Sequence, residues 1–458
     1  MAAVLFKKFV QQKLPFFLPL IQFVEKYFTQ IVLLIITLIF LLTYFESLRW
    51  PLPGPKATHG IAKGLSLVLA VMFTGYWRQK KTQFSSHQNL LMGIFCVSYF
   101  VSAVFSLDLE TSLLHLWYPF MATLIFFFLP TLSIKKEYFS LITVISVLLV
   151  FVTFVFSFFS IIFRYSVDNL YYFIFLDHRA NHLLGEIRKF GKYVSLGPYL
   201  MLVPLIVSPL IEKGAGLTKK LLAFAVFLMA LLTAVISNNR IDVLIFALQF
   251  VVYLFVLSRR QIIALVLPVL LFIWFGLFVT ETYFGFNLEE RIVRPELERD
   301  RETVDMRYTY WQTALNNFRN FPLFGTGPNT YNVVSDFPLR RYYSQGVREY
   351  TFLLDEGIGV HNIFIERLAD TGLFGFFSFV VLLFYFGRTD VLVLIRLKTR
   401  RDQEGFKKYL LYSLGSWSWI MYGITDNGYG AQGFMTFFFL RALLPHVSKT
   451  EYVKQTRR

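Results

Sequence analysis

The sequence predicts an all-α polytopic membrane protein with about 12 transmembrane helices. Apolar residues make up 56% of the 458-residue chain and charged residues only 16%, whereas soluble chains carry about 25% charged residues. Apolar runs long enough to cross about 30 Å of hydrocarbon also recur from end to end. The runs lie near 29–47, 61–77, 90–107, 113–130, 139–163, 194–211, 220–237, 241–257, 261–281, 363–387, 407–424 and 430–446.

Residues 1–28 precede the first run and mix lysines with Phe and Leu, and no small-residue cleavage site follows. We therefore expect a basic amphipathic lead-in on the cytoplasmic face rather than a cleavable signal.

Basic residues gather in every other loop between the runs. W-R-Q-K-K at 77–81, S-R-R-Q at 258–261, R-L-K-T-R-R at 396–401 and the tail at 447–458 are basic, whereas D-L-E-T at 108–111 is acidic. The positive-inside rule then places both termini in the cytoplasm. The net charge of +16 follows from this topology, so we expect membrane lipids and no nucleic acid as partners.

Two outer loops divide the chain. Nine helices are expected in 29–281, with an outer loop near 164–193 inside this block. The segment 282–360 is about 80 residues long, which far exceeds an ordinary connection. It is too hydrophilic to span a membrane, so we predict a helical subdomain outside the membrane between spans 9 and 10. The last three helices then occupy 361–446.

His361 lies where this long loop ends and the tenth span begins. The positive end of a helix dipole favours the neutral imidazole, which can accept a proton. His361 is therefore a candidate general base, with a half-buried structural histidine as the alternative. Glu366, Arg367 and Asp370 follow, either as a wet first turn or as lining of the site. Gly372 and Gly375 have the spacing that allows close helix packing.

Two arginines are candidate anion ligands at the outer face. Arg240 follows Ser237, Asn238 and Asn239 and breaks the positive-inside pattern. A guanidinium matches phosphate oxygens with two hydrogen bonds, so Arg240 is a candidate phosphate ligand. A snorkelling membrane anchor is the alternative for Arg240, although its polar neighbours and the break in the positive-inside pattern argue against it. For Arg188, an anchor and an anion ligand have about equal weight.

We expect no metal site. Cys96 is the only cysteine, which excludes disulfides and cysteine-based metal sites. The carboxylates in 289–302 alternate with arginines, as in a salt-bridged solvated helix. Asp177, His178 and His182 are a metal-binding alternative, although aqueous loops often carry such residues without binding anything.

The segment from Arg307 to Gly375 resembles the O-antigen ligase and polymerase superfamily of bacterial envelopes. R-Y-T-Y-W, then P-L-F-G-T-G-P at 322–328, precedes His361-Asn362, and nine residues separate this pair from Gly372 and Gly375. The family also carries an Arg in a Ser-Arg context, which reads S-N-N-R here, and an upstream Arg before Phe-Gly, matched at 188–191. Lys192-Tyr193 follows the latter, where the family has Asn-Pro.

This resemblance implies a GT-C-like, metal-independent glycosyltransferase without cofactors in the bacterial inner membrane, with its active site facing the periplasm. The implied donor is an undecaprenyl-pyrophosphate-linked glycan. The acceptor is the lipid A-core in a ligase of lipopolysaccharide biosynthesis, or another lipid-linked glycan in a polymerase, and the motif spacing favours the ligase. His361 is expected to be the catalytic base and Arg240 and Arg188 to bind the pyrophosphate. The supporting residues are Arg307, Asn362, Glu366, Gly372 and Gly375.

A transporter or flippase of lipid-linked sugars is the alternative from another class. Carriers usually place polar sites near the membrane midplane and show internal repeats. Here the polar residues gather at the predicted outer face, which favours glycan transfer.

Overall fold

A computed structural model of the chain describes residues 18–47, 55–77, 86–132, 134–135, 137–153, 155, 197–211, 216–236, 240–257, 270–271, 274, 278, 298–331, 360–424 and 431–449. Every element in these ranges is a helix, so the all-α prediction is confirmed for the described residues. The predicted loop at 164–193 lies outside them, as do most of the run 261–281 and residues 282–297 and 332–359 of the segment 282–360.

The helices keep the order of the predicted apolar runs. They are α2 (Leu18–Ser47), α3 (Pro55–Trp77), α4 (Ser86–Val104), α5 (Leu109–His115), α6 (Trp117–Phe128), the 3-10 turn η2 (Leu129–Thr131), a helix at Glu137–Thr153, α9 (Gly197–Leu200), α10 (Val203–Ile211), α11 (Leu217–Ile236), α12 (Arg240–Val256), α15 (Glu298–Asn320), α19 (Ile363–Thr399), α20 (Gln403–Gly423) and α21 (Ala431–Lys449).

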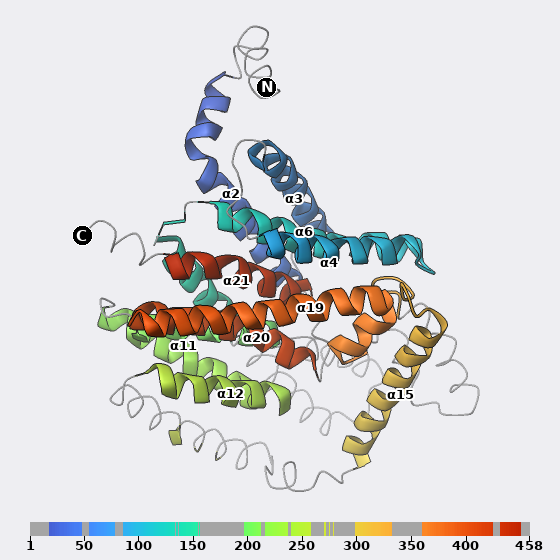
Figure 1. Ribbon diagram of the computed structural model, residues 1–458. Helices are drawn as coiled ribbons and strands as arrows, with labels where there is room; N and C mark the ends of the chain where they lie inside the picture. The colour runs from blue at the N-terminus through green and yellow to red at the C-terminus, as the bar shows by residue number, and fades with distance from the viewer. Residues whose placement is uncertain are drawn as a thin grey trace, which may run out of the picture.

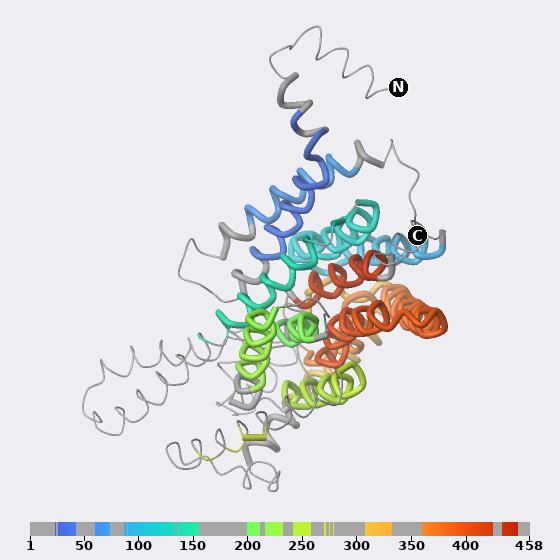
Figure 2. The backbone as a smooth tube through the Cα atoms, turned by 90° about the vertical axis from the view of Figure 1, so that its left-hand side faces the viewer, coloured from blue at the N-terminus to red at the C-terminus, as the bar shows by residue number. Residues whose placement is uncertain are grey.

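Helix α19 crosses the middle of the molecule, with α4 and α6 on one side and α11 and α12 on the other (Figure 1). It packs against α4, α15 and α20, and α20 in turn packs against α21. Helices α2 and α3 pack side by side at the end of the chain coloured blue (Figure 2). Helix α15 packs against α19 and lies beside the start of that helix, on the right-hand side of the molecule in Figure 1.

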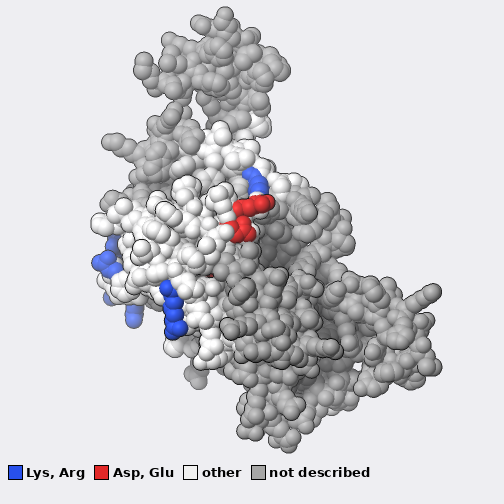
Figure 3. Space-filling model, turned by 90° about the vertical axis from the view of Figure 1, so that its right-hand side faces the viewer, with Lys and Arg blue, Asp and Glu red and all other residues white. Residues whose placement is uncertain are grey.

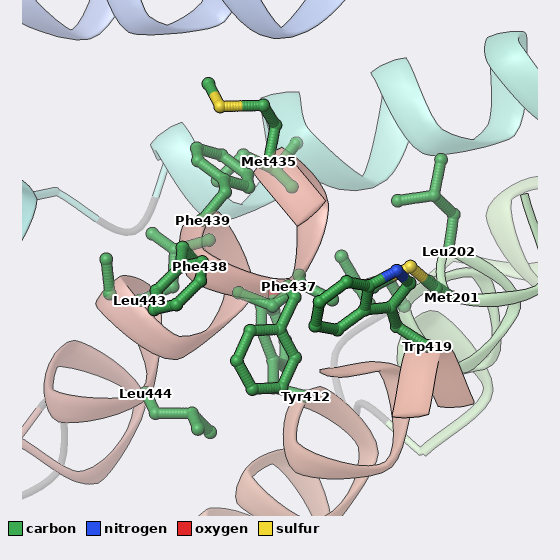
Figure 4. Close-up of a cluster of buried hydrophobic side chains, with 14 of the residues drawn as sticks. Met201, Leu202, Tyr412, Trp419, Met435, Phe437, Phe438, Phe439, Leu443 and Leu444 are labelled. Carbon is green, nitrogen blue, oxygen red and sulfur yellow. The ribbon is translucent and has the colours of Figure 1, made fainter. Parts of the chain in front are cut away.

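The core is rich in aromatic side chains. Trp419 of α20 is 1% exposed, and its ring lies 5.0 Å from that of Phe437 on α21, measured between centroids. Figure 4 shows Trp419 between Phe437 and the Met201–Leu202 turn that joins α9 to α10. Aromatic pairs at such separations stabilise beyond the burial of their area, so this cluster ties α20 and α21 to the α9–α10 segment.

A buried ion pair joins α19 to α21. Arg441 Nη1 lies 2.6 Å from Asp390 Oδ2, and their side chains are 2% and 7% exposed. The Asp390 carboxylate also accepts hydrogen bonds from Tyr409, Ser413 and Trp417 of α20. A buried charge is tolerated when it is paired and hydrogen-bonded in this way. Asp390 therefore holds three helices in one arrangement.

Most of the described helices are apolar, as expected for a membrane protein. Two described segments, Leu109–Thr131 and Ile363–Thr399, have the length and hydropathy to cross a bilayer. Shorter apolar helices include Lys26–Leu42, Leu90–Val104 and Gly433–Val447. On the face shown in Figure 3, charged side chains are sparse and uncharged residues cover most of the described surface.

Some predicted runs differ from the observed helices. The run 194–211 is divided into α9 and α10 by a tight turn in which Leu202 N–H bonds to Tyr199 O at 2.9 Å. Pro204 has no N–H with which to continue the helical ladder, which explains the break. Helix α19 continues to Thr399, so most of the basic segment 396–401 extends the helix instead of forming a loop.

Candidate functional site

The candidate site is built around a break near the start of α19. Gly372 has φ 61° and ψ −165° inside the helix, a backbone conformation that is essentially restricted to glycine. In an unbroken helix, the N–H groups of Leu373 and Phe374 would bond to the carbonyls of Ala369 and Asp370. The break leaves all four groups in need of other partners, because buried backbone groups are nearly always paired.

The loop that follows α15 supplies these partners. Its backbone inserts at the break and replaces the two missing helical bonds with four bonds between the segments. They run from Leu373 N to Pro322 O (2.8 Å), from Phe374 N to Leu323 O (3.2 Å), from Thr326 N to Ala369 O (3.0 Å) and from Gly327 N to Asp370 O (2.9 Å). The P-L-F-G-T-G element and the Gly372 segment therefore form one backbone unit.

Glycines allow the two backbones to meet. A Cβ atom at Gly372 would collide with the backbone of Leu323 and Phe324, and one at Gly325 would collide with the backbone of Asp370. Both glycines also have positive φ. The sequence predicted that Gly372 allows close packing against another helix. In the structure, the close neighbour of Gly372 is the loop after α15. At Gly375 the nearest side chain is that of Thr371, in the same helix.

The corner between α4 and α5 holds the loop from its other side. Leu107 N–H donates to Thr326 O at 3.0 Å, and the Ser106 hydroxyl donates to the same oxygen at 3.1 Å. The Ser102 hydroxyl donates to Asp370 O at 2.8 Å. Three separate parts of the chain, α4, the loop and α19, are therefore joined at one point.

Asp370 anchors the end of the loop with its side chain. Its Oδ2 accepts the Asn329 N–H at 2.9 Å, and Asn329 has φ 59°. The Asn329 amide Nδ2 lies 2.8 Å from His115 Nε2, whose Nδ1 lies 2.8 Å from Thr111 O. Since the amide nitrogen donates, Nε2 accepts and Nδ1 carries the proton, which is the neutral form of His115.

His361 lies directly before the first turn of α19. Its backbone has φ 53°, an uncommon conformation for a residue other than glycine. The imidazole is half-buried and stacks on the ring of Tyr310 of α15, with 6.0 Å between centroids and 19° between planes. Strained backbone of this kind gathers at functional sites, so the geometry is consistent with a functional histidine.

Neighbouring bonds fix the position of His361. Trp311 of α15 donates its Nε1–H to Val360 O at 2.9 Å. Asn362 caps α19, because its Oδ1 accepts the N–H groups of Phe364 and Ile365 at 3.0 and 3.1 Å. Its Nδ2 donates to Ile424 O at 2.9 Å, after α20. His361 is therefore held on both sides, by α15 and by the α19 cap.

The charged residues of the first turns of α19 are buried. Glu366, Arg367 and Asp370 are 7%, 5% and 1% exposed, so they do not form the wet turn that was one of the two expectations. The Arg367 guanidinium lies over the Tyr99 ring, 4.7 Å from its centroid. Asp370 Oδ1 is buried and has no hydrogen-bond partner among the described residues. A carboxylate and a guanidinium thus lie beneath the loop, between α4 and α19.

The structure describes only some of the remaining predicted site residues. Arg307 is half-buried on α15, one turn before Tyr310 and Trp311. Arg240 is the first residue of α12, and its side chain lies outside what the structure describes, as does the whole of Arg188. His361, Asn362, Glu366, Gly372 and Gly375 all belong to the start of α19. In the described chain, no group of three His, Cys, Asp or Glu side chains is arranged to hold a metal ion.

Sequence reasoning missed the polar contacts from α4. Ser98, Ser102 and Ser106 recur every fourth residue in an apolar run, and all three meet α19 or the loop. The Ser98 and Ser378 hydroxyls lie 2.8 Å apart. Small hydroxyl residues at helical spacing are typical of interfaces between membrane helices, so this serine stripe was a usable signal.

A comparison with known protein families gives a match that covers this part of the chain. Residues 224–380 match a family model described as O-antigen ligase, and the match includes α12, α15, the inserted loop and the first half of α19. A search of the curated proteins finds no match. The resemblance to the O-antigen ligase and polymerase superfamily is therefore confirmed for the segment 224–380, which carries the loop insertion and His361.

Proposed function

We propose that this membrane protein transfers a glycan from undecaprenyl pyrophosphate to an acceptor hydroxyl, with His361 as the general base. The observation that carries the proposal is the placement of His361: strained, stacked on Tyr310 and fixed between α15 and the cap of α19. Positioned proton transfer of this kind contributes about 10²- to 10⁴-fold to a rate.

The proposed step is a displacement at the anomeric carbon of the donor. The His361 imidazole takes the proton of the acceptor hydroxyl while its oxygen forms the new glycosidic bond. The bond between the anomeric carbon and the pyrophosphate oxygen breaks, and undecaprenyl pyrophosphate leaves with the electron pair. The family resemblance implies that no metal ion or other cofactor takes part.

Cationic side chains would stabilise the leaving group. We assign the pyrophosphate to Arg240 and Arg188, because guanidinium groups match phosphate oxygens and offset developing negative charge. Arg307, on the helix that packs against His361, would help to hold the donor or the subdomain. Among the supporting residues, Asn362, Gly372 and Gly375 shape the start of α19, and Glu366 lies buried in its first turn.

The proposed topology places this chemistry on the periplasmic face of the bacterial inner membrane. We propose about 12 spans in a GT-C-like arrangement, with the lead-in 1–28 and the tail 447–458 in the cytoplasm. The segment 282–360 would form the periplasmic subdomain, of which α15 and its loop are described. The alternation of basic loops supports this orientation.

The acceptor distinguishes two forms of the reaction. We propose an O-antigen ligase, whose acceptor is the lipid A-core, and the alternative is a polymerase that joins lipid-linked repeat units. Lipopolysaccharide from a deletion strain separates them. Unmodified core with long lipid-linked chains accumulating indicates the ligase, whereas core carrying a single repeat indicates the polymerase.

Replacement of His361 tests the proposal itself. We expect a strain carrying His361→Ala to lose the surface glycan while the protein remains inserted at its usual level. A matched His→Ala change at His87, an exposed residue at the start of α4, is the control and should leave the glycan intact. Normal surface glycan in the His361→Ala strain would overturn the assignment of the base.

A further inference from the structure

The inserted loop carries an exposed apolar patch. The patch consists of Phe105 and Leu107 in the corner between α4 and α5, Leu323 and Phe324 of the loop, and Phe374 of α19. Leu323 and Phe105 are each 61% exposed, and Leu107 is 52% exposed. Exposed apolar groups scattered singly are ordinary, whereas a contiguous patch marks a binding surface.

Ring contacts make the patch continuous. The Phe105 and Phe324 rings stack with 4.9 Å between centroids and 13° between planes. Phe324 also meets Phe374 edge to face at 6.4 Å. The loop sequence F-P-L-F-G-T-G-P-N-T-Y at 321–331 contains no charged residue. The patch therefore belongs to three segments that lie far apart in the sequence.

The patch continues the apolar outer faces of α4 and α19. Both helices expose large apolar side chains at helical spacing along one side, and the two helices pack against each other. The exposed residues are Leu90, Ile94, Val97, Phe100 and Val104 on α4, and Phe377, Val381, Phe384, Val391 and Ile395 on α19. In a membrane protein such stripes face lipid chains, and the patch lies at the end of both stripes.

We propose that this patch inserts into the bilayer, among lipid acyl chains near the headgroups, and anchors the loop to the membrane. Aromatic and aliphatic side chains at the end of a span are typical of the membrane interface. The occupant is bulk membrane lipid, because the patch is continuous with the lipid-facing stripes. The insertion itself does not depend on the proposed reaction. The assignment of the patch to the periplasmic leaflet rests on the proposed function.

The anchor has a consequence for the candidate site. The loop is bonded to α19 through four backbone hydrogen bonds and to the corner between α4 and α5 through Leu107. The depth at which Leu323 lies in the bilayer therefore also fixes the depth of Gly372. Through the first turns of α19, it fixes the depth of His361 as well. The height of His361 above the lipid chains would be set by the patch, which suits a donor whose pyrophosphate lies at the membrane surface.

Fluorescence quenching with single-cysteine variants tests the insertion. Cys96→Ser gives a background without the native thiol and keeps a hydroxyl within reach of Thr123. Leu323→Cys and Leu107→Cys each carry a bimane label, and Gln312→Cys, on an exposed position of α15, is the matched control. The protein is placed in vesicles of phosphatidylethanolamine and phosphatidylglycerol without any lipid-linked glycan.

We expect acyl-chain spin-labelled lipid to quench the labels at 323 and 107 at least about threefold more than the label at 312, and iodide in water to do the reverse. Iodide access at 323 and 107 equal to that at 312 would overturn the proposal. Protection of the labels from both quenchers would also overturn it, because a second protein copy would then cover the patch. Loss of lipid quenching when undecaprenyl phosphate is added would overturn it too, because the polyprenyl chain of the donor would then occupy the patch. Because no glycan transfer is measured, failure here is distinct from failure of the proposed function.

Discussion

Replacing Gly372 by alanine tests the insertion of the loop into α19. The new Cβ atom meets the backbone of Leu323 and Phe324, with 2.5 Å to the Leu323 carbonyl carbon and oxygen. Neither partner can rotate away, because both are backbone. The φ of 61° and ψ of −165° at this position also lie outside the range of an alanine residue.

The cost follows from these contacts. Holding a residue with a side chain in this backbone conformation costs about 1–3 kcal/mol. The clash of the new Cβ atom also forces the loop away, so the bonds from Leu373 N to Pro322 O and from Phe374 N to Leu323 O are lost as well, at about 1 kcal/mol each, and more where the N–H stays buried. We therefore expect Gly372→Ala to lower the free energy of unfolding by about 3–5 kcal/mol.

Unfolding of the purified protein in mixed micelles measures this difference, and Gly387→Ala is the matched control. Gly387 lies in the same helix, and its added Cβ would be 3.6 Å from the Trp417 ring, an ordinary contact. Alanine should stabilise the helix there by about 0.5–1 kcal/mol. Equal stability of Gly372→Ala and Gly387→Ala, with equal transfer activity, would refute the loop insertion.

Three further changes probe other parts of the structure. Arg441→Met should destabilise the protein by about 3–5 kcal/mol because it leaves Asp390 buried and unpaired; unfolding of the double variant with Asp390→Leu, which should recover much of the loss, checks this. Trp311→Phe removes the bond to Val360 O and should cost about 0.5–1.5 kcal/mol, measured by unfolding, with an unchanged midpoint as the contrary result. Hydrogen bonds from the side chain and then the backbone of Thr111 hold the pKa of Asp108 below its usual range. The Asp108 carboxylate therefore contributes stability above about pH 4, and this contribution is lost as the pH falls through the lowered pKa. When the pH is lowered through this range, an Asp108→Asn variant should lose less thermal stability than the wild type.

Hydropathy was sufficient to predict the helices but not their interruptions. Most described helices overlap the predicted runs, because a helix that crosses the core or the membrane is apolar over most of its length; α15 lies instead in the predicted outer subdomain. The division at Pro204 and the kink at Gly372 depend on which partner replaces the missing helical bonds. That partner lies about 50 residues away from Gly372 in the sequence, beyond what local patterns reveal.

For the candidate site, the sequence predicted where some residues lie along α19 but not the contacts that they make. The positions of His361 and Asn362 at the start of α19 could be inferred from the turn before them and the apolar run after them. The stacking on Tyr310 and the burial of Glu366 and Asp370 could not, because they depend on how α15 and α4 pack against α19. For Asp390 and Arg441, the sequence shows two charges in apolar helices and gives no indication that they pair.

The most direct test of the account is the rate of glycan transfer by purified protein in defined lipid, compared between the wild type and His361→Asn. Asparagine tolerates the positive φ at this position and removes the base, so the fold should be retained. With a defined undecaprenyl-pyrophosphate-linked donor at saturation, the account predicts a rate at least about 100-fold below that of the wild type. A rate within a few fold of the wild type, from protein that unfolds at the same midpoint, would contradict the role of His361.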